Sequence, residues 1–197
     1  GSRHKPVVMS LGLHLNDEEI LKSVDTLKEA GANEIVVLHC NTVYPTPPAI
    51  NALYQIKHLR ALLPELVIGY SDHTVGWHMV TAAVALGASV IEKHISFDKT
   101  DKRSFDCPGS CLPEDLKLMV NEIREIEAAM KDAGEARNEK IINGRKWASQ
   151  SIVARVDIPQ GTKISSDMLA FKRPGVGLHP QEAGKLIGKK TKVKIEA

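Results

Sequence analysis

The sequence predicts an α/β fold, a partial (half) TIM-type β/α barrel with parallel strands followed by a small β-rich domain. Three observations predict it. In the first two thirds of the chain, apolar β-branched runs alternate four times with helical patterns, as in parallel sheets with helical crossovers. After about residue 132 the composition becomes polar and then β-rich. Polar residues also follow several predicted strands directly, as they do at the functional end of such barrels.

The first strand–helix unit has the clearest helix signal. A strand is predicted over 7–10, and a helix over 17–30, where apolar residues recur at helical spacing. Asn16 is the predicted N-cap, and Glu19, three residues later, completes a capping box. This unit is therefore predicted as a strand followed by a well-capped amphipathic helix.

Three further units repeat this order. Their predicted strands and helices lie at 35–40 and 50–62, at 67–71 and 79–86, and at 89–94 and 113–130. A closed barrel needs eight such units and about 250 residues, so four units make half a barrel. No Gly-x-Gly-x-x-Gly motif is present, and the sequence therefore gives no support to a dinucleotide-binding fold.

The domain boundaries follow the change in composition. We predict a half barrel over 3–132, a polar linker over 133–146 and a β-rich domain over 147–197. Short β-type runs at 151–154, 163–164 and 191–195 are separated by Pro/Gly turn signals. A domain of about 50 residues has a marginal core, so we expect it to dock on another surface.

Composition limits the classes of partner. The chain of 197 residues has a net charge of +2 and no long run of one sign, which argues against nucleic acid or an anionic membrane as a partner. No apolar stretch reaches the roughly 20 residues of a membrane span. Three cysteines are too few for a disulfide framework, and a cytoplasmic location is expected.

Two histidines are the main candidates for a metal site. His73 and His94 each come at the end of a predicted buried strand, and neighbouring strand ends meet at one edge of a parallel sheet. Asp72 and Glu92 are close enough in sequence to orient them. Histidine with oxygen ligands suits manganese, iron, zinc or magnesium, and the sequence leaves this choice open.

Other strand ends carry groups that could bind substrate. Ser10 and Ser71 are small hydroxyls beside backbone N–H groups, an arrangement that suits phosphate or carboxylate. His39 is either a third ligand, a hydrogen-bonding partner of the substrate or a buried core histidine. Lys93 and Asp106 are further titratable candidates, although Lys93 could equally point to the other face of the sheet.

The β-rich domain has one candidate of its own. Arg173 precedes a Pro-Gly turn that would hold its guanidinium rigidly, which suits a carboxylate or phosphate. The alternative is a solvated loop arginine.

Five motifs together resemble the sialic acid (N-acetylneuraminate) synthase family. The stretches at 5–12 and 39–45 resemble the family's Lys-Pro-Val-Ile-Leu-Ser-Thr-Gly and His-Cys-Thr-Ser-x-Tyr-Pro. Gly-Tyr-Ser-Asp-His-Thr is intact at 69–74 and Ile-Glu-Lys-His at 91–94. Lys-Arg-Pro-Gly at 172–175 matches the family's antifreeze-like (SAF) domain, a β-clip fold. The motifs cover nearly the whole chain in the family's order.

The resemblance implies a role for each candidate. His73 and His94 would bind a divalent metal, typically Mn²⁺, with Mg²⁺ as an alternative, and with Asp106 they are the expected catalytic residues. The expected contacts to phosphoenolpyruvate and to an N-acetylated amino sugar are Ser10, Ser71, Thr42, Tyr44, Asp106 and Arg173. Arg173 would come from the partner subunit of a domain-swapped homodimer.

The chain also departs from the family pattern. The family's Gly-Pro-Asp-His-x-x-Ser-Leu loop is replaced by Ser-Phe-Asp-Cys-Pro-Gly-Ser-Cys at 104–111, so the sugar stays open. The first four strands of the family's barrel have no counterpart, so this chain alone is expected to be inactive or nearly so as a synthase. The alternatives are a carbohydrate-binding or assembly module without catalysis, and an unrelated metal-dependent aldolase or hydrolase.

Overall fold

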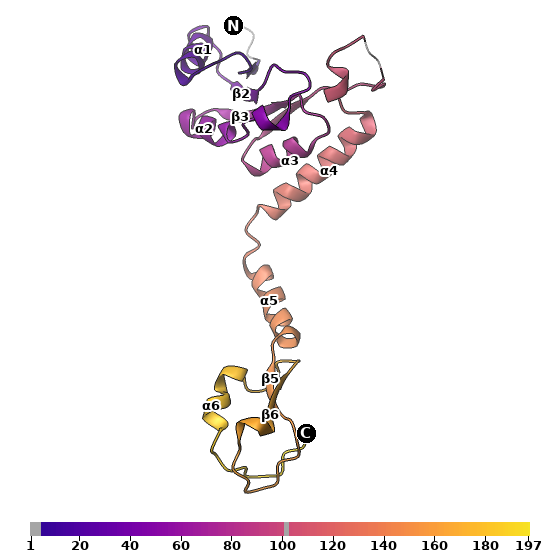
Figure 1. Cartoon of the computed structure of the whole chain (residues 1–197). Coiled ribbons are helices and arrows are strands. Elements are labelled where there is room, and N and C mark those ends of the chain that lie inside the picture. Colours follow the sequence, from indigo (N-terminus) through magenta and orange to yellow (C-terminus); the bar gives the residue numbers. More distant parts are fainter. Residues whose placement is uncertain (1–4, 101–102) are drawn as a thin grey trace. The chain divides into compact units, whose positions relative to one another are not determined.

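The computed structural model describes residues 5–100 and 103–197 and divides into two compact units (Figure 1). The first unit runs to Lys131 and the second begins at Asp132. Within the described part of the chain, no helix is long and apolar enough to cross a membrane.

The first unit is a four-stranded parallel sheet in the order β1-β2-β3-β4. Helices connect the strands, so the predicted half barrel is confirmed. The strands are β1 (Val7–Ser10), β2 (Ile35–Cys40), β3 (Val67–Asp72) and β4 (Val90–Lys93). The helices are α1 (Asp17–Glu29), α2 (Gln55–Leu62), α3 (His78–Ala85) and α4 (Pro113–Ala129).

Local sequence explains how the first two helices begin. Asn16 caps α1, because its Oδ1 accepts a hydrogen bond from the Glu19 N–H at 3.0 Å. The Glu19 carboxylate accepts a hydrogen bond from the Leu15 N–H at 2.9 Å, one residue before the Asn16 N–H that a capping box would use.

α2 begins later than the predicted residue 50, because a short 3₁₀ turn at Pro48–Ile50 is followed by Ala52 with φ of 52°.

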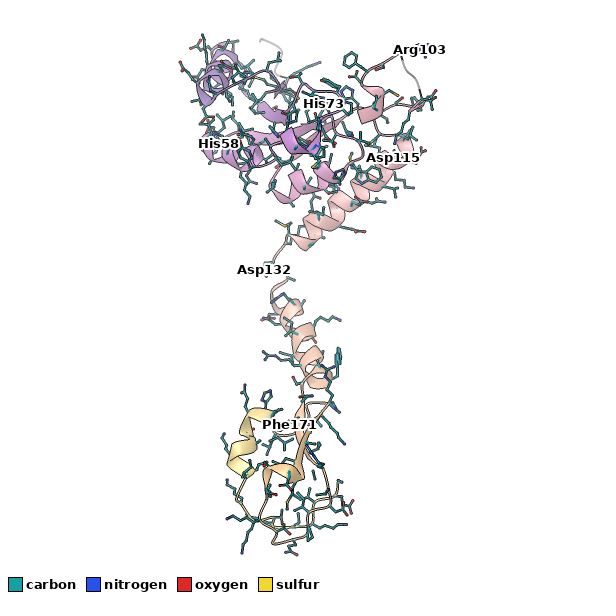
Figure 2. The ribbon with its side chains drawn as sticks, viewed as in Figure 1. His58, His73, Arg103, Asp115, Asp132 and Phe171 are labelled. Atoms are coloured by element: carbon teal, nitrogen blue, oxygen red, sulfur yellow. The ribbon has the colours of Figure 1, made fainter. Side chains whose placement is uncertain are left out.

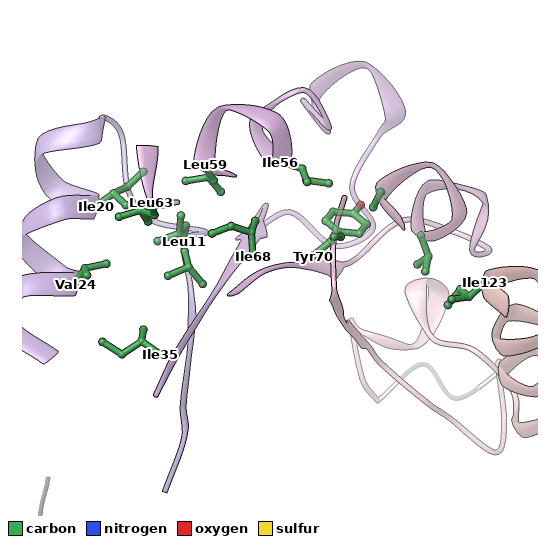
Figure 3. Close-up of a cluster of buried hydrophobic side chains, with 14 of the residues drawn as sticks. Leu11, Ile20, Val24, Ile35, Ile56, Leu59, Leu63, Ile68, Tyr70 and Ile123 are labelled. Atoms are coloured by element: carbon green, nitrogen blue, oxygen red, sulfur yellow. The ribbon is translucent and has the colours of Figure 1, made fainter. Parts of the chain in front are cut away.

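The core lies between the sheet and its helices (Figure 3). Val24, Ile56 and Val80 from three helices pack there with Val37 and Ile68 from the sheet, and each is at most 3% exposed. Burying each such side chain stabilises the fold by about 1.5–3 kcal/mol. We call this helix-covered side of the sheet the outer face, and the opposite side the inner face.

The inner face is packed at its centre and open at its margins. Leu38 is fully buried there because β3 has a glycine beside it: a Cβ on Gly69 would lie 2.4 Å from Leu38 Cδ2. By contrast, Val8 and Val67 on the same face are 53% and 45% exposed. The chain therefore completes the outer layer of the sheet but leaves part of the inner face uncovered.

The second unit is a small antiparallel β region preceded by a helix. β5 (Ser151–Ala154) pairs with β6 (Leu169–Lys172), and α6 (Ala183–Leu186) lies in the same unit. The predicted run at 151–154 is a strand, whereas 163–164 and 191–195 contribute single bridges, Lys163 with Lys190 and Ile158 with Ile195. Residues 134–146 of the predicted linker are helical, within α5 (Gly134–Ala148), which has no buried residue.

Candidate metal and substrate site

Alternation along the strands creates two polar layers where the strands end. Side chains on a strand point in turn to opposite faces of the sheet. Ile68 and Tyr70 belong to the outer core, which places Gly69 and Ser71 on the inner face. The same parity sorts the polar residues of all four strands. The inner layer contains Ser10, Cys40, Ser71 and Glu92, and the outer layer contains His39, Tyr70, Asp72 and Lys93.

His73 and His94 come together at the ends of β3 and β4. Their ring centroids are 5.1 Å apart, and His73 is only 5% exposed (Figure 2 labels His73). Since each histidine directly follows its strand, the parallel pairing of β3 with β4 brings the two rings to the same edge of the sheet.

A backbone carbonyl sets the orientation of His73. Its Nδ1 lies 2.6 Å from the carbonyl oxygen of Asn41, and a carbonyl can only accept, so Nδ1 carries the proton in this contact. Nε2 of a neutral His73 therefore keeps a lone pair. The acidic neighbours Asp72 and Glu92, expected to orient the histidines, bond to groups other than the imidazole rings. The Asp72 carboxylate is bonded to Lys93 and Tyr70, and that of Glu92 accepts from Ser71.

These two imidazoles fit part of a site for a divalent metal. Metal-binding histidines ordinarily donate their other ring N–H to a carboxylate, a backbone carbonyl or water, as His73 does. Among the described residues, no group of three or more His, Cys, Asp or Glu side chains is arranged to hold an ion. The two imidazoles are thus not part of a larger cluster of such side chains in the described part of the chain.

Tyr44 joins the histidines to a neighbouring loop. Its ring centroid lies 4.1 Å from that of His73 and 5.8 Å from that of His94. Phe105 meets the same ring edge-on at 5.4 Å, although Phe105 is 72% exposed. Burial, and to a smaller extent the negative charge of Asp106, raises the pKa of the Tyr44 hydroxyl, which therefore stays protonated at neutral pH. Tyr44 and Phe105 form an aromatic wall beside the two imidazoles.

Hydroxyl groups lie on the same inner edge. Ser71 is buried and donates to Glu92 Oε1 at 2.6 Å, while Ser10 at the end of β1 is exposed. The Thr42 hydroxyl donates to the Gly12 carbonyl at 2.6 Å, which ties the loop after β2 to the loop after β1. Burial raises the pKa of the Cys40 thiol, so Cys40 lacks the thiolate that a nucleophile needs.

Two sequence candidates lie on the other face of the sheet. His39 donates through Nε2 to the Asn51 carbonyl at 2.7 Å and stacks on Tyr70, so it is a buried outer-face histidine and not a third ligand. Lys93 also points outward, to Asp72. Arg173 belongs to the second unit, where it is exposed.

Two residues beside the histidines were not among the sequence candidates. Asn41 acts through its backbone carbonyl, a group that every residue has, so no sequence signal marks it. Phe105 did carry a signal, because it stands where the resembling motif has proline in the loop at 104–111. Its contact with Tyr44 became visible only in three dimensions.

The fold and the site define a class of protein: a parallel β/α half barrel whose functional groups lie at the carboxyl ends of its strands. The chain belongs to the NeuB family, whose model matches residues 1–135, and a SAF domain matches residues 149–197.

Individual relatives agree with this assignment. An uncharacterised protein of Methanocaldococcus jannaschii is 38% identical over 95% of this chain and 55% of its own length. The N,N'-diacetyllegionaminic acid synthase of Legionella pneumophila is 32% identical over 100% of this chain and 55% of its own. The structure of an N-acetylneuraminic acid (sialic acid) synthetase from Leptospira borgpetersenii aligns with a TM-score of 0.61 at 32% identity, over 71% of this chain and 48% of that one. The chain thus spans about half the length of these relatives.

Proposed function

We propose that this chain is part of a phosphoenolpyruvate-dependent nonulosonate synthase. In the proposed reaction, C3 of phosphoenolpyruvate bonds to the aldehyde carbon of an N-acetylated amino sugar, and the aldehyde oxygen becomes a hydroxyl. Water adds at C2, and inorganic phosphate leaves to give a 2-keto acid. The observation that carries the proposal is the pair of imidazoles, whose ring centroids are 5.1 Å apart, with a lone pair on Nε2 of His73, in a chain of the NeuB family.

Each candidate residue takes a role consistent with its position. His73 and His94 would hold a divalent metal, Mn²⁺ or Mg²⁺, which when bound supplies a Lewis acid for the aldehyde oxygen. Ser71 and Ser10 would bind phosphoenolpyruvate from the inner edge of the sheet. The sugar would face Thr42, Tyr44 and Asp106, with the aromatic wall of Tyr44 and Phe105 beside it.

The chain spans only about half of its relatives, so we expect little or no turnover from it alone. Positioning and charge stabilisation supply most of such a rate, and both depend on a complete site. The test is phosphate release from phosphoenolpyruvate, N-acetylmannosamine and Mn²⁺, expected to be far below 1 per second. Turnover at that rate or faster would contradict this part of the proposal.

Metal binding is the direct test of the site. Calorimetry with Mn²⁺ should give one site per chain, and the double variant His73→Ala/His94→Ala should lose it. His78→Ala is the matched control, since His78 is an exposed histidine at the start of α3. Binding that survives in the double variant, or disappears in the control, would overturn the assignment.

We also propose that the chain functions in a domain-swapped homodimer with Arg173 over the partner's histidines. The support is indirect: β1 and β4 are edge strands, and Val8 and Val67 leave the inner face open. Sedimentation should show self-association at micromolar concentration. A clean monomer of 21.5 kDa would refute the dimer without affecting the metal assignment.

A further inference from the structure

A buried polar network lies behind the two histidines, on the outer face of the sheet. We call Tyr70, Asp72 and Lys93 the outer-layer network. Lys93 Nζ donates to Asp72 Oδ2 at 2.8 Å, and their side chains are 2% and 0% exposed. Tyr70, 1% exposed, donates its hydroxyl to Asp72 Oδ1 at 2.8 Å. None of these three side chains has a role in the function proposed above.

The same network holds the backbone on the C-terminal side of His73. Asp72 Oδ1 also accepts from the Thr74 N–H at 2.9 Å. Lys93 Nζ donates a second bond, to the Thr74 carbonyl, at 2.7 Å. The His73 carbonyl accepts from the Thr46 N–H at 2.9 Å, across the loop that carries Tyr44. Three hydrogen bonds thus hold the backbone at residues 73 and 74, and two of them come from the outer-layer network.

Stability alone does not account for such a pair. Removing two opposite charges from water costs several kcal/mol per ion, and well-packed apolar residues often serve as well or better. A buried pair can nevertheless select one backbone arrangement over its competitors, since each competing arrangement leaves a charge unpaired. Here the arrangement selected is the turn that carries His73.

We propose that Tyr70, Asp72 and Lys93 are positioning residues for His73. They fix the turn at 72–74 so that Nδ1 meets the Asn41 carbonyl and Nε2 keeps its lone pair. The use of that free nitrogen by a metal rests on the proposed function. The orientation of the ring and the position of its proton do not.

The first experiment therefore reads the proton on His73 without any metal. Long-range ¹H–¹⁵N spectra of the full chain, at a pH well above the ordinary histidine pKa, distinguish the Nδ1–H and Nε2–H tautomers. The parent should show His73 as the Nδ1–H form alone. The double variant Asp72→Asn/Lys93→Met removes the ion pair without leaving a buried charge, and its His73 should shift toward the Nε2–H form.

Two further variants keep the test decisive if the double variant fails to fold. Tyr70→Phe removes one hydroxyl and should shift the His73 tautomer in the same direction by a smaller amount. Val80→Ala is the control, because Val80 is fully buried in the outer core and outside the network. It should lower stability and leave the His73 signal unchanged. His58, exposed on α2, serves as an internal reference in every spectrum.

Metal affinity supplies the second measurement. Loss of groups that orient a ligand typically weakens metal binding 10–100-fold, and we expect that range for the double variant with Mn²⁺. If the parent chain binds no Mn²⁺, the proposed metal site is refuted. The tautomer spectra would still test whether the network positions His73. The role is overturned if His73 keeps one tautomer in both network variants, or if Val80→Ala changes it equally.

Discussion

The polar residues on the two faces of the four-stranded sheet differ in burial and in pairing. On the outer face, the charges of Asp72 and Lys93 are buried and paired, with hydrogen bonds to neighbouring groups. On the inner face, Ser10 and Glu92 are exposed, as are the apolar side chains of Val8 and Val67. The outer face is therefore closed by the helices, whereas the inner face is open over part of its area. Substitutions on the two faces should differ accordingly.

The largest effect is expected from Lys93→Met alone. This change leaves the Asp72 carboxylate buried without its cation, and breaking such a pair typically costs about 3–5 kcal/mol. Glu92→Gln on the inner face should change the free energy of unfolding by no more than about 0.5 kcal/mol, because Glu92 is exposed. Chemical denaturation of both variants measures the contrast. Equal losses would mean that the two faces do not differ as described.

The next effect concerns the close packing of the inner face at its centre. Gly69→Ala would place Cβ 2.4 Å from both Leu38 Cδ2 and the Val90 carbonyl oxygen, and the backbone contact cannot be relieved by a rotamer change. Overpacking of this kind costs about 1–3 kcal/mol. In the control Gly144→Ala, nothing lies within 4 Å of the new Cβ. On an exposed helix that change should stabilise by about 1 kcal/mol. A neutral Gly69→Ala would contradict the packing argument.

Features that depend on local sequence were predicted well, and features that depend on contacts between distant segments were not. Hydrophobic periodicity is local, and it identified the four parallel strands and the strand ends at His73 and His94. Residues 91 and 93 point to the same face of β4, so the contact of Ile91 with the outer core also places Lys93 on the outer face. The sequence alone left open to which face Lys93 points. The Asn41 carbonyl and the late start of α2 depend on loop geometry, which residue types alone do not determine.

The β-rich unit was predicted less well for a related reason. Its strand β6, Leu169–Lys172, is a short run of mixed character that carries little β signal. The short β-type runs at 163–164 and 191–195 are predicted as β instead, and each contributes only one residue to an isolated bridge. In so small a unit, long-range pairing decides which short run becomes a strand.

A smaller effect should appear in the pH dependence of stability. Burial lowers the pKa of His39, because the outer core disfavours its charged form. The unfolded chain therefore binds this proton more readily than the folded one. The contribution is fully favourable above the ordinary histidine pKa of 6.5 and is lost as the pH falls toward the lower folded value. Denaturation midpoints for the parent should fall over this window.

His39→Gln keeps an amide donor for the Asn51 carbonyl and removes the titrating group. In that variant the same window should be flatter than in the parent. His78→Gln, at an exposed site, should keep the slope of the parent. An unchanged slope in His39→Gln would show that another group causes the acid sensitivity.

The smallest effect on stability is expected from a substitution at Ala52, which lies shortly before α2. Its φ of 52° places it in the left-handed region, where a Cβ costs roughly 1–2 kcal/mol. The strained turn sets the preceding carbonyl, that of Asn51, to accept from His39 and from the Asn41 amide, at 2.7 and 3.0 Å. Ala52→Gly removes the strain but gives the unfolded chain more freedom, so the net gain should be about 0.5–1 kcal/mol. Thermal melts should rise slightly, with the Asn51 contacts unchanged. A lower melting temperature would indicate that the Ala52 methyl group makes a packing contribution larger than its strain.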